Sequence, residues 1–161
     1  MPTPDFILRL REKVGHDRLW LSGATAVVLR DTAAGRAVLL VQRTDDRSWT
    51  PVSGIVDPGE HPHHAALREV VEETGVTAEV EALAWLTVTE VITYPNGDET
   101  EYIDHVFRCR WVAGEPAPGD DEAVQASFFP VDALPPMAPR HLDAIRVALA
   151  GEPGTRLGPL R

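Results

Sequence analysis

The chain has 161 residues, of which 43% are hydrophobic, so residues 1–161 are expected to form a single domain with a buried core. The formal net charge of −10 disfavours nonspecific binding to nucleic acid or to an anionic membrane. The single cysteine, Cys109, excludes a disulfide within the chain, which is typical of the reducing cytoplasm. Charges interrupt the apolar residues at the start of the chain, so we expect no signal peptide, and no stretch approaches transmembrane length.

The first elements are predicted from hydrophobic spacing. Residues 4–14 place apolar side chains at helical intervals and predict a short helix. Residues 19–30 and 37–44 are rich in aliphatic side chains and predict two strands, the second as a continuous apolar run of the buried kind. A loop then leads to a short strand before residue 54.

The second half of the chain predicts a hairpin, a strand and a helix. Residues 78–93 predict one long strand or two short ones, and 102–111 predict a strand that returns beside them. The dipeptide Asn96-Gly97 between them is a strong turn signal. The remaining patterns predict a loop, a strand, a helix and a frayed tail, at residues 114–121, 126–131, 139–150 and 151–161.

The segment 54–76 predicts a loop followed by a helix with two different faces. Glu69, Glu72 and Glu73 stand at i, i+3 and i+4, so their carboxylates project from one side. Pro62 suits the first turn and Gly75 suits a left-handed C-cap. The side that we expect to pack on a sheet carries Ala66, Leu67, Val70, Val71 and Thr74.

Clustered carboxylates have two interpretations. Like charges one turn apart repel, and a solvated acidic helix face is common at protein surfaces. Alternatively, oxygen ligands that converge from one face suit a hard cation such as Mg²⁺ or Mn²⁺. Because such cations bind phosphate oxygens, a phosphorylated substrate follows as a hypothesis.

The whole segment favours the second interpretation, because it resembles the signature box of the Nudix hydrolases. That box reads glycine, five residues, glutamate, seven residues, Arg-Glu, an aliphatic residue, any residue, Glu-Glu, any residue, glycine and an aliphatic residue. The fixed positions are all met, by Gly54, Glu60, Arg68, Glu69, Val70, Glu72, Glu73, Gly75 and Val76. One departure is Ser53, where many members have a second glycine.

The resemblance implies a fold and a metal site. The expected fold is α/β, a Nudix-type α/β/α sandwich around a mixed β-sheet, which the predicted order of elements allows. The implied cofactor is Mg²⁺ or Mn²⁺. Its implied ligands are the backbone carbonyl of Gly54 and the carboxylates of Glu60, Glu69, Glu72 and Glu73.

The general base has two candidates. Glu69 could take a proton from water, or it could be a ligand. Some family members use a late loop instead, and there Glu122 stands nearest the next strand, beside Asp120 and Asp121. Arg68 starts from a different part of the helix than Glu69, and we expect it to pair with glutamates and orient them.

The substrate pocket is predicted less sharply. Arg43, Trp49, Tyr94 and Phe128 could stack on a base or clamp a phosphate, although each residue type also packs in ordinary cores and surfaces. The histidines at 61, 63 and 64 lack the two-element spacing of a zinc site, so we interpret them as a polar helix turn.

The leading hypothesis is a cytoplasmic, metal-dependent pyrophosphohydrolase that cleaves a diphosphate linkage in a nucleoside diphosphate derivative. Candidate substrates are a nucleoside triphosphate, a dinucleoside polyphosphate and a nucleotide sugar, and a homodimer is possible. One alternative is a noncatalytic Nudix module that binds a nucleotide and regulates another process. The other is an isomerase of the isopentenyl diphosphate type, whose chemistry uses a cysteine and a glutamate, but Cys109 lies in no matching motif.

Overall fold

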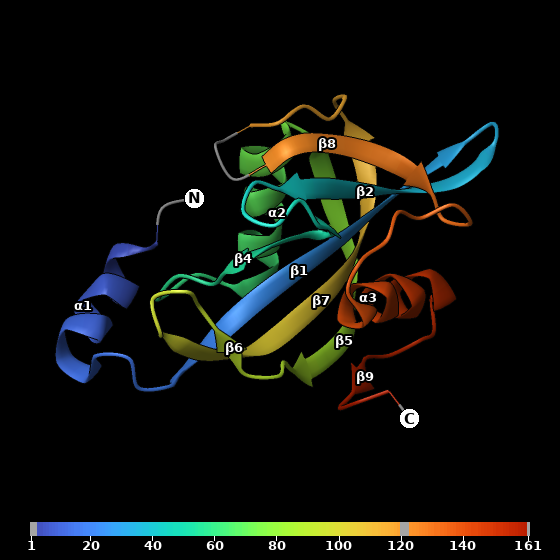
Figure 1. Ribbon diagram of the computed structural model, residues 1–161. Coiled ribbons are helices and arrows are strands. Elements are labelled where there is room, and N and C mark those ends of the chain that lie inside the picture. The colour runs from blue at the N-terminus through green and yellow to red at the C-terminus, as the bar shows by residue number, and fades with distance from the viewer. Residues whose placement is uncertain (1–2, 120–122, 161) are drawn as a thin grey trace.

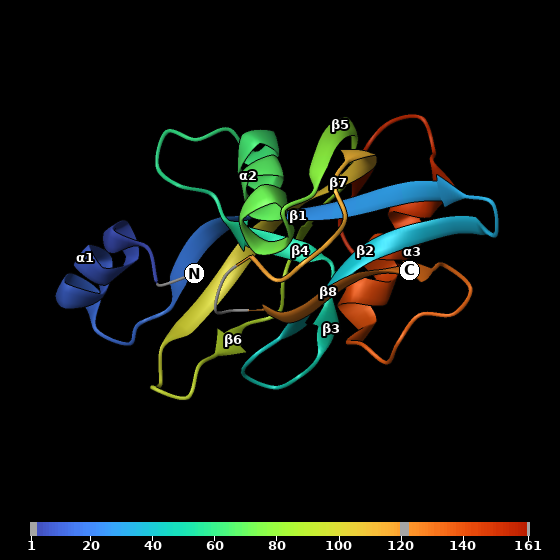
Figure 2. The ribbon, with the colours of Figure 1, turned by 90° about the horizontal axis from the view of Figure 1, so that it is seen from above.

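The computed structural model describes residues 3–119 and 123–160. Within them, nine strands join one mixed sheet, with α2 (Pro62–Thr74) on one face and α3 (Pro139–Ala150) on the other (Figures 1 and 2). The first helix, α1 (Asp5–Val14), stands at one end of the molecule (Figure 1). The predicted α/β class with a mixed sheet between helices is confirmed.

Except for the last one, the strands follow the predicted order. Their bounds are β1 (Leu19–Thr32), β2 (Gly35–Arg43), β3 (Trp49–Thr50), β4 (Val52–Ile55), β5 (Thr77–Val88), β6 (Ile92–Thr93), β7 (Glu99–Ala113), β8 (Ala123–Pro130) and β9 (Arg156–Leu157). The central pair, β1 and β7, is parallel, whereas β1 pairs antiparallel with both β2 and β4. The short β4 therefore lies beside β1, and the loop that leads to α2 begins at its end.

The predicted hairpin is present. Strands β5 and β6 both pair antiparallel with β7, so the segment 78–93 forms one long and one short strand. Gly97 has φ +89°, which favours glycine at this position of the turn. The turn is closed by the backbone N–H of Tyr94, which donates to Asp98 O at 2.9 Å.

The sheet separates two apolar clusters. The cluster under α2 contains Ala24, Ala26 and Val28 of β1, whereas the cluster under α3 contains Val27 and Leu29 of the same strand. This alternation is the two-residue period of a strand whose two faces are both covered. Both helices are therefore held by burial of apolar surface against one shared sheet.

The C-terminal tail differs from our expectation. Instead of fraying throughout, it contains β9, which pairs parallel with β5 at Trp85 and Leu86. The Trp85 indole donates to Gly158 O at 2.7 Å, and the Thr155 hydroxyl donates to Leu83 O at 2.9 Å. Hydrogen bonds to β5 therefore hold the tail in place, although its composition alone indicates a flexible segment.

In residues 3–119 and 123–160, no helix is both long enough and apolar enough to cross a membrane.

Candidate active site

Helix α2 begins and ends where the sequence predicts. Pro62 occupies the first turn, and Gly75 adopts the left-handed conformation, with φ 68° and its N–H donating to Val71 O at 2.9 Å. Our prediction for its buried face was partly wrong, because Val71 is 53% exposed. Two of the residues that α2 buries are glutamates. The buried residues are Ala65, Ala66, Glu69, Val70, Glu73 and Thr74.

Glu69 is buried directly against the backbone of Gly54. Only 3% of the residue is exposed. A Cβ atom on Gly54 would lie 2.2 Å from the Glu69 carboxyl carbon, so the Glu69 side chain would have to move. Glycine at 54 is therefore what lets strand β4 and the carboxylate of α2 meet, and it brings two of the predicted metal ligands together.

Arg68 links the glutamates of the box. Its Nε and Nη2 donate to both oxygens of Glu60, at 2.9 and 3.0 Å. Its Nη1 donates to Glu69 at 2.7 Å and to Glu72 at 3.1 Å. The predicted ion pairing is therefore present, and the long side chain reaches Glu69 although the two residues leave the helix in different directions. Such a fork fixes carboxylates in position.

The electrostatics of this cluster differ from one glutamate to the next. Burial raises the pKa of Glu69 to about 7, although Arg68 acts in the opposite direction. The hydrogen bonds from Arg68 lower the pKa of Glu60. A buried carboxylate with a raised pKa gains from a further positive charge nearby. Glu69 therefore suits either a cation or a proton.

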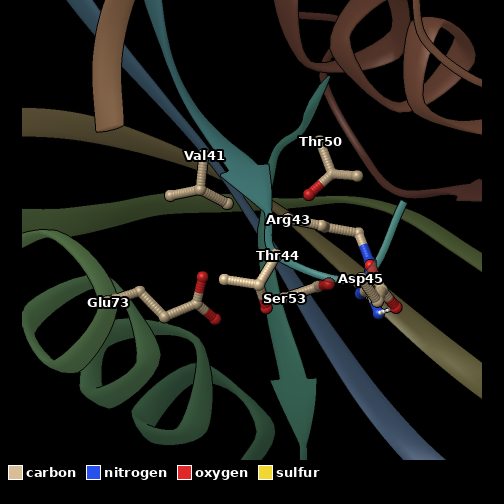
Figure 3. A pocket seen from close by; sticks show the side chains of 7 residues that line it. All are labelled: Val41, Arg43, Thr44, Asp45, Thr50, Ser53 and Glu73. Carbon is tan, nitrogen blue, oxygen red and sulfur yellow. Dashed lines mark hydrogen bonds and ion pairs between the residues drawn. The ribbon is translucent and has the colours of Figure 1, made fainter. Parts of the chain in front are cut away.

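Glu73 extends from α2 into a cavity of about 260 Å³ (Figure 3). The residue is 8% exposed. Hydroxyl and charged groups dominate the cavity wall, which consists of Val41, Arg43, Thr44, Asp45, Thr50, Ser53 and Glu73. A cavity below the usual range for whole ligands, roughly 300–1,000 Å³, fits a polar part of a nucleotide better than all of it.

The four predicted substrate residues lie in different places. Arg43 lines the cavity. The Trp49 ring packs edge-on against Phe129 at 4.7 Å, next to the apolar cluster under α3. The Tyr94 hydroxyl lies 3.2 Å from that of Tyr102. A role of Trp49 or Tyr94 in substrate binding stays a prediction.

Phe128, the fourth candidate, packs against the cluster under α2, and the Arg30 guanidinium stacks on its ring at 3.8 Å. Sequence reasoning missed the cavity residues Thr44, Asp45, Thr50 and Ser53. Their position in the sequence could have indicated them, because they directly follow the end of β2 or lie in the short strands β3 and β4 before the box.

The second candidate base, Glu122, lies outside the described residues, as do Asp120 and Asp121. The segment before them is held at the end of α2. The N–H of Ala117 donates to Thr74 O at 3.0 Å, and that of Gly119 donates to Glu73 O at 2.9 Å. These bonds satisfy carbonyls that the last turn of a helix leaves open.

The fit of the site to a cation rests on its donor chemistry. Among the described residues, no group of three or more His, Cys, Asp or Glu side chains is already arranged to hold a metal. The oxygens of Glu69, Glu72, Glu73 and the Gly54 carbonyl are nevertheless of the kind that Mg²⁺ binds. Glu60 is engaged by Arg68 and Asp57, which suits support of the other glutamates.

The family described as NUDIX domain matches residues 20–148 of this sequence, from β1 to α3. The chain belongs to the Nudix family. The match includes the complete box, the strands that carry the cavity wall and both helices that cover the sheet. The resemblance first indicated by the box is therefore confirmed.

Individual relatives resemble parts of this Nudix chain. An NAD-capped RNA hydrolase of Pseudomonas aeruginosa is 35% identical over 89 residues, which is 55% of this chain and 29% of that protein. An oxidized purine nucleoside triphosphate hydrolase of Danio rerio is 34% identical over 88 residues, covering 54% and 52%. The chain thus spans about half the length, or less, of these curated relatives.

Among solved structures, a UDP-X diphosphatase superposes on this Nudix chain with a TM-score of 0.68 at 22% identity. The match covers 95% of this chain and 74% of the other. At such low sequence identity the likeness establishes a common fold.

Proposed function

We propose that this Nudix chain is a metal-dependent pyrophosphohydrolase that cleaves a diphosphate linkage in a nucleoside diphosphate derivative. The observation that carries the proposal is the placement of Glu69 and Glu73. Both carboxylates are buried on α2, and Glu73 faces a cavity whose wall also holds Arg43. Arg68 offsets part of the cost of burying Glu69, and two acids on one helix face beside a polar cavity suit a site that binds a cation.

Different residues of the chain would bind the metal, support its ligands and bind the substrate. The residues that would hold Mg²⁺ or Mn²⁺ are Gly54 through its carbonyl, Glu72 and Glu73, and Glu69 is either a further ligand or the base. A bound cation of this kind neutralises phosphate oxygens and lowers the pKa of water. Arg68 holds three of the glutamates in place, and Arg43 supplies positive charge to the substrate.

Glu69 is our first candidate for the general base, with Glu122 as the second. A base works best when its pKa lies near the working pH, and the pKa of Glu69 is raised to about 7. In that role, the Glu69 carboxylate accepts a proton as water attacks phosphorus and the bond to the bridging oxygen breaks. Arg68 Nη1 remains bound to Glu69 Oε1 at 2.7 Å, which leaves the other oxygen for the proton.

Two alternatives receive less support from the site. A noncatalytic binding module has no need to keep every glutamate of the box, and this chain retains all of them. An isomerase that used Cys109 would need an accessible thiol. That thiol is fully buried, and burial raises its pKa to about 12.

The relatives support a substrate of the nucleotide type without selecting one, since they are named for different substrates. Cytoplasmic location and a homodimer remain predictions of the sequence. Exposed apolar residues on and beside α1, among them Leu8, Val14 and Trp20, are compatible with a homodimer, which light scattering can test.

The decisive experiment measures phosphate or nucleotide release from nucleoside triphosphates, dinucleoside polyphosphates, ADP-ribose and nucleotide sugars, with Mg²⁺ or Mn²⁺ and with excess chelator. We expect turnover of at least one substrate that chelator abolishes. Glu73→Gln should lower kcat by at least about 10²-fold, because a metal-holding carboxylate stabilises the transition state by several kcal/mol. Glu79→Gln on β5 is the matched control, since that carboxylate pairs with Arg110 on the surface. Full turnover in chelator would contradict the proposal.

A further inference from the structure

The cavity contains a charged pair that the box does not explain. Arg43 donates from Nε to Asp45 Oδ1 at 2.9 Å and from Nη2 to Asp45 Oδ2 at 2.6 Å. Both residues line the cavity that Glu73 faces (Figure 3). A carboxylate next to a site for an anionic substrate repels that substrate, so its presence there calls for a reason.

The geometry of the pair supplies that reason. The two bonds occupy the Nε edge of the guanidinium, and arginine has five N–H donors in one plane. Fixing one edge fixes the plane, so the other donors keep a set direction relative to the cavity. Holding a long side chain in advance removes part of the entropy that binding would otherwise cost.

The loop around Asp45 contains further hydrogen bonds. Asp45 Oδ1 also accepts the N–H of Asp46 at 2.8 Å, and the N–H of Arg43 donates to Ser48 O at 2.9 Å. The Gln42 amide donates to Arg47 O at 2.9 Å. Arg47 has φ 61°, and it is the only residue other than glycine with a positive φ in the described part of the chain. Strained backbone of this kind is kept where the surroundings determine it.

We propose that Asp45 is a positioning residue, which holds the Arg43 guanidinium at the cavity wall so that it binds a phosphate of the substrate at the end away from Glu73. This inference rests on the proposed function and extends it. The hydroxyls of Thr44, Thr50 and Ser53 line the same cavity, so the group that it receives is a sugar–phosphate portion rather than a nucleobase.

The charge state of the pair fits this role. The hydrogen bonds from Arg43 lower the pKa of Asp45 to about 2, so the carboxylate is ionised at neutral pH. An ordinary surface pair contributes little, roughly 0–1 kcal/mol, to stability. The expected effect of Asp45 therefore appears in ligand binding and not in the melting temperature.

The test is a double-mutant cycle read by calorimetric binding of α,β-methylene-ADP, a nucleoside diphosphate that cannot be hydrolysed at its anhydride bond, in the presence of Mg²⁺. We expect Asp45→Asn to weaken binding about five- to tenfold, since one charged, bidentate contact is lost. Arg43→Ala should weaken binding at least as much, and the double variant should match Arg43→Ala within about twofold, because Asp45 acts only through Arg43. Asp45→Glu should recover most of the affinity.

The matched control is Asp31→Asn. Asp31 forms the same side-on pair with Arg36, at 2.8 and 3.4 Å, in the hairpin of β1 and β2, outside the cavity wall. That variant removes the same charge and should bind normally. Tighter or unchanged binding by Asp45→Asn, additive effects in the cycle, or no binding by the wild type would each overturn the proposal.

Kinetics separate the two proposals. On any substrate that the wild type cleaves, Asp45→Asn should raise KM and leave kcat unchanged, the pattern of a lost uniform binding contact. Hydrolysis by the wild type with normal binding by Asp45→Asn would refute only the positioning role. Absence of hydrolysis with the predicted binding cycle would refute only the enzymatic activity.

Discussion

Helices α2 and α3 are built alike but bury different side chains. Each begins with a proline in its first turn, ends at a glycine in the left-handed conformation, and covers one face of the same sheet. Helix α3 buries Ala144, Ile145, Ala148 and a histidine. Helix α2 buries two glutamates. Packing accounts for the apolar residues that α3 buries, whereas the buried acids of α2 oppose stability unless a positive charge, such as Arg68 or a bound cation, offsets their burial.

The largest effect should come from Glu69. We expect Glu69→Gln to lower kcat by ~10²–10⁴-fold, because the group that accepts the proton is lost. Glu122→Gln should have a clearly smaller effect. Both variants are compared at saturating metal and substrate. If only Glu122→Gln shows the large loss, the late loop supplies the base and the assignment of Glu69 is wrong.

A smaller loss should follow from Arg68→Gln. The variant removes the bonds that hold Glu60, Glu69 and Glu72, and supporting contacts of this kind typically contribute ~10–100-fold to activity. The matched control on the other helix is Arg146→Gln, which breaks an exposed pair with Asp143. Steady-state kinetics should separate the two. Equal kcat values for both variants would mean that Arg68 does not contribute to catalysis.

Gly54→Ala tests the contact between β4 and α2. Its Cβ would meet the Glu69 carboxyl group, so we expect a loss of about 1–3 kcal/mol in unfolding free energy, as for other overpacked sites, together with lower activity. Gly23→Ala in the neighbouring strand β1 is the control, because its nearest contact would be 3.4 Å. Denaturant unfolding gives the comparison. A Gly54→Ala variant as stable as Gly23→Ala would contradict the close packing of Glu69.

The smallest effect concerns the polar residue that α3 buries. Burial and the nearby Arg140 and Arg43 lower the pKa of His141 to about 4, from an ordinary value of 6.5. Between about pH 6.5 and about pH 4, His141 is therefore protonated in the unfolded chain but neutral in the folded chain. The free energy of unfolding falls as the pH drops through this range. His141→Leu should reduce this fall by an amount on the order of 1–2 kcal/mol, measured as unfolding free energy against pH.

The exposed His64→Gln serves as the control for that measurement. It should change the pH dependence much less than His141→Leu does. If His141→Leu and His64→Gln give the same profile as the wild type, the acid sensitivity of the fold comes from other groups.

The order of elements and the box could be predicted from the sequence, because hydrophobic period, turn residues and a nine-position motif are local signals. Glu69 and Glu73 were proposed as site residues for the same reason. Their burial could not be predicted, since it depends on β4 passing beside α2 with a glycine at the contact. The exposure of Val71 could not be predicted either, because an apolar residue on a helix is usually expected to be buried.

The cavity wall was predicted less well because its residues come from separate elements. Arg43 was proposed as a substrate residue, but its partner Asp45 was not, since two adjacent charges in a loop resemble ordinary surface. The tail was misjudged because composition indicates flexibility, whereas the bond from Trp85 to Gly158 depends on tertiary structure.

Cys109 offers a built-in probe of how the molecule opens. The thiol lies on β7 with no exposed surface, and its pKa is raised to about 12. A thiol reagent can therefore modify it only after β7 separates from the core. The sequence has no other cysteine, so the labelling rate in native buffer would time the opening of the central sheet without any engineered reporter.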